Sequence, residues 1–549
     1  MESSSRKGLF RIHAWIGLQL GYLLFAVCLT GTLAVLSAEL LWLVNPQQRI
    51  ASREAAAPQS WQPLSWQKLH DAVTAAHPQA TLLYLQAPDG PRSPVRAILA
   101  YGPQDYRGVP VDPHSYAVGE NRSSFGLQSF LRILHKQLYL VPGVVGFHGT
   151  LIVGLLALPL LVAVYTGLAS VRRWWRAMRQ IRRGRSPRLF WSDLHRCAGL
   201  WAATITILLA LTGLWYFAEI ILQDARLISE DAPVQRLPAA AMAQRPAVLP
   251  PFDLDAAAAA AQAAWPGINL SQLALPQRAD DPLVFTGQAE AWLVRDRANR
   301  ILIDPLTNGV LDVQRAEDLL ALQRWIATAD PLHFGNFAGL ASKLVWFATG
   351  LLLCGGILSG LISAWLRLQR QPDAGLSRTL LVSAVCTLLL LGAAAHGAVV
   401  YGYGFQRLAQ QPRELRALGE IAVGPWQMQV HAVVTGARLE RIELHSAGLA
   451  NLRHATLEGT AMRRAGRKLW LPAEAVSCSA GCKLQFEDWA GARHIASVMI
   501  APDAASQRVA LPLAADVSRS ESLLIALTLL LLLLPLGFWL RLLWRAGKS

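Results

Sequence analysis

Six of the thirteen histidines in this chain lie within or beside long apolar stretches of the sequence. Ionisable side chains at membrane depth are costly and rare, so they mark functional sites by default. Neutral imidazole binds iron strongly, and the same ring can carry a proton near neutral pH. For a single histidine, a place among lipid headgroups explains the position equally well. The arrangement of all six therefore has to distinguish functional histidines from interfacial ones. The six are His13, His135, His148, His195, His333 and His396.

The apolar stretches around these histidines number six, and the chain as a whole is 53% apolar. A helix of about 20 apolar residues spans the ~30 Å hydrocarbon core of a bilayer. The sequence therefore predicts a polytopic α-helical membrane protein with about six transmembrane helices. The runs lie near residues 14–44, 143–171, 197–222, 338–366, 379–400 and 522–544.

The net charge of +15 suggests a nucleic-acid partner, but the placement of the positive residues argues against one. Seventeen lysines and arginines form four clusters, which all fall on one side if every apolar run crosses the membrane. Positive residues favour the cytoplasmic side. We therefore predict a bacterial inner-membrane protein with both termini in the cytoplasm, surrounded by lipid. The clusters are Arg6, Lys7 and Arg11; Arg172, Arg173, Arg176, Arg179, Arg182, Arg183, Arg185 and Arg188; Arg367, Arg370 and Arg378; and Arg541, Arg545 and Lys548.

The helices repeat. The first contains His13-x3-Gly17 followed by Thr30-Gly31, and the third contains His195-x3-Gly199 followed by Thr212-Gly213, with a His-to-Thr spacing of 17 in both. The returning helices contain Thr166-Gly167 and Ser359-Gly360, and each follows a Leu-His pair that ends in His135 or His333. Residues 1–175 and 176–370 thus read as two copies of one unit. Internal repeats of membrane helices commonly place the functional site at their interface.

Each copy also holds a predicted periplasmic segment with a helix-like stretch, 65–78 or 253–266, followed by alternating apolar and polar residues typical of strands. An Asp-Pro turn follows at Asp112 and again at Asp304. We expect two small α+β periplasmic modules.

The remainder of the chain, 371–549, reads as an appended unit with one helix, a strand-rich periplasmic segment and a last helix. Cys478 and Cys482 are the only cysteines in its periplasmic part. An oxidising compartment favours a structural disulfide between them, and a redox-active pair is the alternative.

The predicted topology sorts the histidines into two pairs. His13 with His195 would clamp one haem near the cytoplasmic face, and His135 with His333 would clamp a second near the periplasmic face. Glycines at Gly17, Gly31, Gly199, Gly213, Gly339 and Gly360 would admit a flat macrocycle, although close helix packing explains them as well. His148 competes with His135, because it begins the second apolar run, but it has no counterpart in the second copy. His396 lies outside the repeat, and we expect it either to support a ligand from behind or to lie on the substrate side.

The combination of H-x3-G…TG helices, a Leu-His pair before the returning helix and an Asp-Pro turn in each module resembles the PepSY-associated transmembrane family, over roughly residues 8–370. The resemblance implies PepSY modules and a four-helix core that binds two b-type haems through His13, His195, His135 and His333. It also implies the reduction of ferric siderophores. The first turn departs from the pattern, with His114-Ser115-Tyr116 where Thr and Gly are expected, and the C-terminal unit lies outside the resemblance.

The sequence contains no G-x-G-x-x-G after a predicted strand, no P-loop and no C-x-x-C-H. A reductase would therefore take electrons from outside the chain, from a quinol or a cytoplasmic reductase. The arginine-rich segment 172–188 could dock such a donor or anionic lipid heads, and a topology determinant is the simpler interpretation. Two other functions stay open: a non-enzymatic PepSY module that regulates a periplasmic partner, and a transporter of an iron chelate.

Overall fold

The structure is a computed structural model that describes residues 3–46, 49, 65–88, 93–142, 148–229, 234–291, 293–368, 378–476, 481–501 and 507–548. Within these ranges, six helices are long and apolar enough to cross a membrane, which confirms the six predicted spans. Their outer faces carry exposed apolar side chains such as Leu389 and Leu534, so these helices contact lipid. The spans comprise α1 (Ser3–Val35), α6 (Gly149–Leu155) with α7 (Ala157–Ser170), α9 (Pro187–Asp224), α13 (Gly339–Leu368), α14 (Arg378–Gly397) continued by η4 (Ala398–Tyr403) and α15 (Gly404–Gln410), and α16 (Arg519–Lys548).

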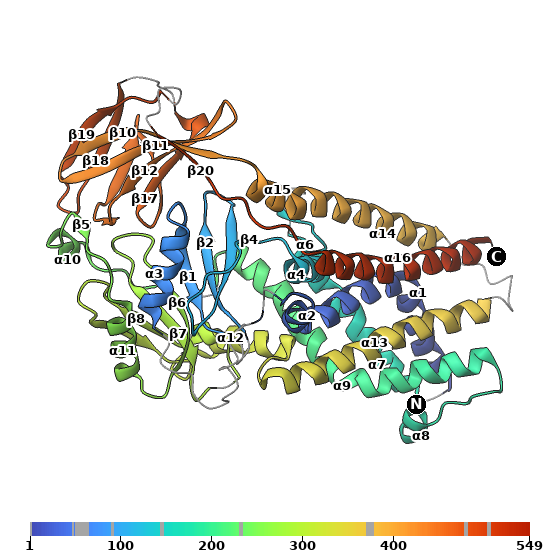
Figure 1. Cartoon of the computed structure of the whole chain (residues 1–549). Coiled ribbons are helices and arrows are strands. Elements are labelled where there is room, and N and C mark those ends of the chain that lie inside the picture. Colours follow the sequence, from blue (N-terminus) through green and yellow to red (C-terminus); the bar gives the residue numbers. More distant parts are fainter. Residues whose placement is uncertain are drawn as a thin grey trace.

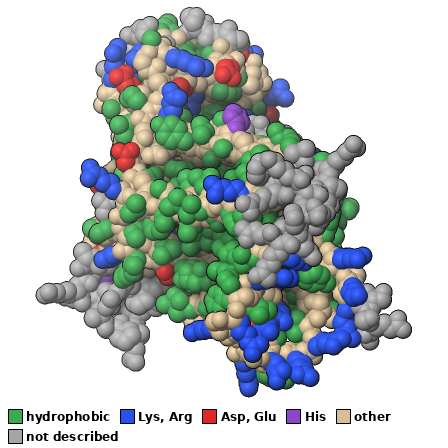
Figure 2. All heavy atoms as spheres, turned by 90° about the vertical axis from the view of Figure 1, so that its right-hand side faces the viewer, with side chains coloured by type: hydrophobic (Ala, Val, Ile, Leu, Met, Phe, Trp, Pro, Cys, Tyr) green, Lys and Arg blue, Asp and Glu red, His purple; other side chains and the backbone are tan. Residues whose placement is uncertain are grey.

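The two sequence repeats supply the centre of the helical bundle. α1 and α9 both pack against α13 and against α7, while α14 and α16 pack together beside them. Both chain termini lie at one end of the bundle, here called the terminal end, and the sheets lie at the other, called the sheet end (Figure 1). Seen from the terminal end, Lys and Arg side chains gather in the lower part of the molecule (Figure 2). Shorter helices lie at the ends of the membrane-spanning helices: α2 (Ser37–Val44), α4 (Leu127–Gln137), α8 (Trp174–Arg179) and α12 (Ala321–Phe334).

Each repeat also contributes one helix and a run of strands outside the bundle. The helices begin near the predicted positions, because Ser65 caps α3 and Asp253 caps α11 through their side chains. The two units form one antiparallel sheet of order β4-β3-β2-β1-β6-β7-β8-β9, and Leu85 of β1 pairs with Leu273 of β6 across the join. Their periplasmic location stays a prediction. The elements are α3 (Trp66–Ala76), β1 (Thr81–Gln86), β2 (Val95–Ala100), β3 (Tyr106–Val111) and β4 (Arg122–Ser123), then α11 (Leu254–Ala264), β6 (Asn269–Ala274), β7 (Leu283–Gln288), η3 (Asp296–Ala298), β8 (Arg300–Ile303) and β9 (Val310–Gln314).

The C-terminal unit is strand-rich, as predicted. It holds a six-stranded sheet of order β16-β17-β12-β11-β10-β20 and a four-stranded sheet of order β15-β14-β18-β19, which enclose Trp426 and Phe486. Cys482 is disulfide-bonded, and Cys478 lies outside the described residues. Its elements are β10 (Glu414–Val423), β11 (Trp426–Thr435), β12 (Arg438–Ser446), β13 (Leu449–Ala450), β14 (His454–Leu457), β15 (Thr460–Ala461), β16 (Arg463–Ala465), β17 (Lys468–Pro472), η5 (Ala473–Ala475), β18 (Cys482–Glu487), β19 (Arg493–Val498) and β20 (Gln507–Ala510). β13 pairs with β5 (Val248–Leu249), which follows α10 (Ala239–Ala243).

Candidate functional site

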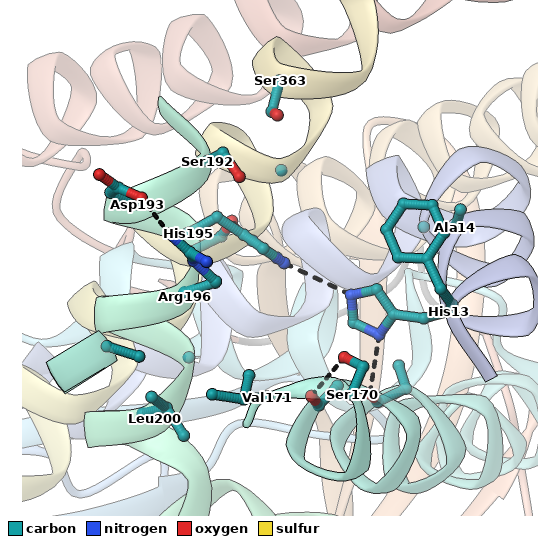
Figure 3. A pocket seen from close by; sticks show the side chains of 18 of the residues that line it. His13, Ala14, Ser170, Val171, Ser192, Asp193, His195, Arg196, Leu200 and Ser363 are labelled. Carbon is teal, nitrogen blue, oxygen red and sulfur yellow. Dashed lines mark hydrogen bonds and ion pairs between the residues drawn. The ribbon is translucent and has the colours of Figure 1, made fainter. Parts of the chain in front are cut away.

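The first histidine pair lies toward the terminal end of the bundle and joins the two repeats. His13 on α1 and His195 on α9 face each other with their Nε2 atoms 3.4 Å apart (Figure 3). Their ring centroids are 5.6 Å apart and the ring planes are inclined by 57°. The structure thus brings together two residues, 182 positions apart, that the repeat predicts to be partners.

The second pair lies toward the sheet end and also joins the repeats. His135 on α4 and His333 on α12 have ring centroids 6.0 Å apart and planes inclined by 33°. Burial lowers the pKa of His135 below its usual value and lowers the pKa of His333 to about 3. Both rings are therefore neutral at neutral pH, which is the form of imidazole that binds metals.

Three histidines of these pairs pack on a Thr-Gly or Ser-Gly dipeptide of a neighbouring helix in their own repeat, and the fourth contacts the Thr of such a dipeptide. In three cases Nδ1 donates to the backbone carbonyl three residues before the Thr or Ser, and the hydroxyl of that Thr or Ser donates to the same carbonyl. In the fourth case, His333 Nδ1 bonds the hydroxyl of Thr212 itself, at 2.8 Å. The three carbonyl contacts are His13 to Ala163 O (2.9 Å), His135 to Val27 O (2.9 Å) and His195 to Gly356 O (2.7 Å), shared with Thr166, Thr30 and Ser359.

The glycine of the dipeptide makes this contact possible. A helical side chain leans toward the N-terminus and covers the preceding turn, so the residue four positions after a carbonyl shields it. At Gly31, Gly167 and Gly360 an added Cβ would lie only 2.6, 3.2 and 2.9 Å from the nearest atom of His135, His13 and His195. These glycines therefore open a helix carbonyl to an imidazole from the next helix.

The carbonyl contacts also fix the tautomer of three rings. A carbonyl oxygen can only accept, so Nδ1 carries the proton and Nε2 of the neutral ring carries a lone pair. For His13 and His195, two lone pairs then face each other at 3.4 Å. A hydrogen bond between them would require one ring to be a cation inside the bundle, which is costly. A group that accepts electron pairs, placed between the two nitrogens, would bind both lone pairs.

A cavity of about 1610 Å³ opens beside this pair. His13, His195 and the glycines Gly17, Gly199 and Gly360 line it, and nothing lies within 4 Å of a Cβ placed on Gly17 or Gly199. These two glycines are each one helical turn beyond a histidine, in the H-x3-G motif of the sequence. The motif therefore leaves open space next to each ring.

The remaining candidates lie elsewhere. His148 precedes α6, is half-buried, and makes no hydrogen bond or ring contact with any described residue of the pairs. The structure thus places His135, rather than His148, against His333. His396 lies near the end of α14 and is exposed. Among the described residues, Gly213 and Gly339 make no contact with the four histidines.

A polar chain of side chains, which the sequence does not predict, reaches the second pair. The ring of Tyr216 meets His333 edge-on at 5.2 Å between centroids, and its hydroxyl donates to Asp330 at 2.8 Å. Arg295, which precedes η3, lies 3.4 Å from the same carboxylate. The repeat offers no signal for Tyr216, because the matching position in the first copy is Ala34.

Comparison with known proteins places most of the chain in one family. The family model described as the PepSY-associated TM region matches residues 10–367, which is more than half of the 549 residues. The chain belongs to this family. The match extends over the two repeats of this chain, includes both histidine pairs, and ends at the last residues of α13. No curated protein matches the chain.

Proposed function

We propose that the chain is a haem-containing reductase of the bacterial inner membrane, which passes electrons across the membrane to a ferric siderophore or another periplasmic ferric complex and so releases iron. One observation carries the proposal. Two histidine pairs lie at opposite ends of the bundle, and each pair takes one histidine from the first repeat and one from the second. Two electron-transfer sites stacked across a membrane are what such a conduit requires.

The four histidines are of a type that would hold haem iron. His13 and His195 would hold one b-type haem, and His135 and His333 a second; each haem would supply one-electron redox chemistry. The Nε2 atoms of His13 and His195 already face each other at 3.4 Å, so both rings would be available to one metal ion. Within the described ranges no group of three or more His, Cys, Asp or Glu side chains is placed to hold a metal ion. A two-histidine site suits a metal that brings its other ligands with it.

The residues around the pairs orient the ligands. Carbonyls of Ala163, Val27 and Gly356 accept from Nδ1 and aim Nε2 into the site, as outer hydrogen bonds do for metal-bound imidazoles. The hydroxyl of Thr212 orients His333 in the same way, and Asp330 holds the hydroxyl of Tyr216 beside the ring of His333.

The proposed orientation puts the termini in the cytoplasm and the sheets in the periplasm. Basic side chains around the terminal end support it, because positive residues favour the cytoplasmic side. The donor would then act at His13 and His195, as a quinol or a cytoplasmic reductase, and the ferric complex at the sheet end. The non-enzymatic module and the transporter remain the alternatives, and neither requires haem.

The test is the haem content of the purified full-length protein. We expect two haems per chain and split α and β absorbance bands after reduction with dithionite. His13→Ala and His135→Ala should each lose one haem equivalent. A ferric siderophore added to the reduced protein should return the oxidised spectrum.

His148→Ala and His396→Ala are the matched controls, since both residues lie outside the pairs, and each should retain two haems. A full-length protein without stoichiometric haem, or a loss in His148→Ala equal to that in His135→Ala, would refute the assignment.

A further inference from the structure

The cavity beside His13 and His195 has a strongly cationic lining. Twelve lysine and arginine side chains line it, against Asp193 as the sole acidic residue among the described lining residues. The formal charge of the lining is therefore +11. Two carboxylates of a bound haem would reduce it only to +9. The basic residues are Arg6, Lys7, Arg11, Arg172, Arg173, Arg176, Arg182, Arg183, Arg185, Arg188, Arg196 and Arg367.

These charges converge on the cavity from separate elements. They come from the start of α1, from α8 and the segments on either side of it, from the first turns of α9, and from the end of α13. A topology signal alone requires positive residues on one side of the membrane, and it does not require them to surround one hollow. Like charges around a cavity raise its positive potential and draw anions into it.

Asp193 holds part of this lining in place. Its buried carboxylate accepts from the backbone N of Arg182 at 3.0 Å and from Arg182 Nε and Nη2 at 2.8 and 2.9 Å. It also pairs with Arg196 on the next turn of α9 (Figure 3). The segment after α8 is thereby folded back onto α9, so the neighbouring Arg183 and Arg185 lie at the cavity rather than away from the molecule.

The size of the cavity allows more than one occupant. Cofactor and small-molecule sites are commonly about 300–1,000 Å³. At about 1610 Å³, the cavity exceeds that range. Its inner part is formed by small and apolar residues such as Gly21, Leu24 and Ile357, while the cations lie at the helix ends and the connecting segment.

We infer that the outer part of this cavity binds a phosphate-bearing ligand, with Arg176 and Arg183 among its contacts. Guanidinium groups bind phosphate oxygens through paired, charge-assisted hydrogen bonds. The phosphate belongs either to a soluble molecule or to a lipid headgroup, because both present the same chemistry. This inference goes beyond the proposed reductase function and does not depend on haem being present.

The test compares two double variants with equal loss of charge. Arg176→Gln with Arg183→Gln removes two lining side chains. Arg179→Gln with Arg541→Gln removes two exposed arginines that do not line the cavity; Arg179 lies one turn from Arg176 on α8 and stacks on Trp175. Binding is measured by titration calorimetry on the full chain in uncharged detergent. Inorganic pyrophosphate is the soluble probe, and dihexanoyl phosphatidylglycerol is the lipid probe.

We expect saturable binding of at least one probe, weakened by about tenfold or more in the lining variant, because this variant loses two charge-assisted contacts to the phosphate. The control variant should bind like the unmodified chain. Pyrophosphate binding assigns a soluble ligand, and binding of the lipid alone assigns a headgroup. Failure of both probes, or equal weakening in both double variants, would overturn the inference. Haem absorbance, read in the same samples, separates this outcome from failure of the proposed function.

Discussion

At the scale of single residues, His13, His135 and His195 share one device, whereas His333 bonds the hydroxyl of Thr212 directly. A Thr or Ser hydroxyl folds back on its own helix, and the glycine after it clears the way for a ring from the next helix. In this device a backbone carbonyl of the helix, rather than another side chain, accepts the hydrogen bond from the histidine. It therefore sets ring orientation and helix spacing together, and a methyl group on the glycine disturbs both.

Gly31→Ala tests this device. The added Cβ would lie 2.6 Å from His135 Cε1, so His135 must move and its bond to Val27 O is lost. Overpacking of this kind costs about 1–3 kcal/mol. We expect a lower midpoint of thermal unfolding in detergent and, under the proposed function, loss of one haem equivalent.

Gly355→Ala on α13 is the matched control, since nothing lies within 4 Å of its added Cβ. Alanine favours a helix more than glycine does, so this variant should be as stable as the unmodified chain or slightly more so. Equal midpoints for the two variants would show that Gly31 does not make room for His135.

At the scale of elements, the sequence predicts the spans well, because burial in lipid demands unbroken apolar runs. The sequence predicts the third span at 197–222, whereas α9 runs from Pro187 to Asp224, because its polar first turns carry no hydropathy signal. The pairing of β1 with β6 was beyond prediction: the two strands lie more than 180 residues apart and meet only when the repeats dock. The histidine pairs were predictable in part, because the repeat marks them, but the carbonyl contacts depend on helix packing.

Strands β11 and β12 carry a histidine pair, with His431 buried and His445 half-buried, that makes their stability depend on pH. The rings of His431 and His445 lie 4.3 Å apart, next to Glu443 and Lys468. Burial, helped by the charge of His445, lowers the pKa of His431 to about 4, and burial also lowers the pKa of His445. Although burial opposes it, Lys468 and Arg441 hold the pKa of Glu443 well below its usual value.

The signs of these shifts agree. Between about pH 6.5 and 4 the unfolded chain takes up a proton at His431 that the folded chain does not, so stability falls as pH falls. The lowered pKa of His445 acts in the same direction below about pH 6.5. Each proton contributes up to about 1.4 kcal/mol per pH unit. The contribution of Glu443 is lost in turn below its unfolded pKa. We expect amide exchange in β11 and β12, corrected for its intrinsic pH dependence, to speed up from pH 7 to pH 5.

His431→Gln should make this dependence shallower. His454→Gln, at an exposed position of β14, should leave it unchanged. A slope that is the same in both variants would mean that His431 does not govern the acid response.

At the scale of the whole molecule, buried charges join the C-terminal unit to the eight-stranded sheet. Asp105, between β2 and β3, accepts from Arg107 Nε and Nη2, each at 2.9 Å, and also pairs with Arg413, just before β10. All three side chains are buried. Arg107 further donates to Pro512 O at 2.6 Å and stacks on Tyr101. The family match ends at residue 367, so this junction attaches a unit outside the matched region.

Asp105→Asn should loosen that junction. The amide keeps the shape of the carboxylate but leaves Arg107 and Arg413 as buried cations without a counter-charge, which costs about 3–5 kcal/mol. We expect the chain to be cut faster by protease near residues 411–413, while the helical bundle keeps its unfolding midpoint. Asp71→Asn, at an exposed position on α3, should change neither, because exposed ion pairs contribute about 0–1 kcal/mol. If Asp105→Asn is cut no faster than Asp71→Asn, the C-terminal unit is held by its remaining contacts to the sheet, such as Arg441 Nη2 to Tyr101 O at 2.9 Å.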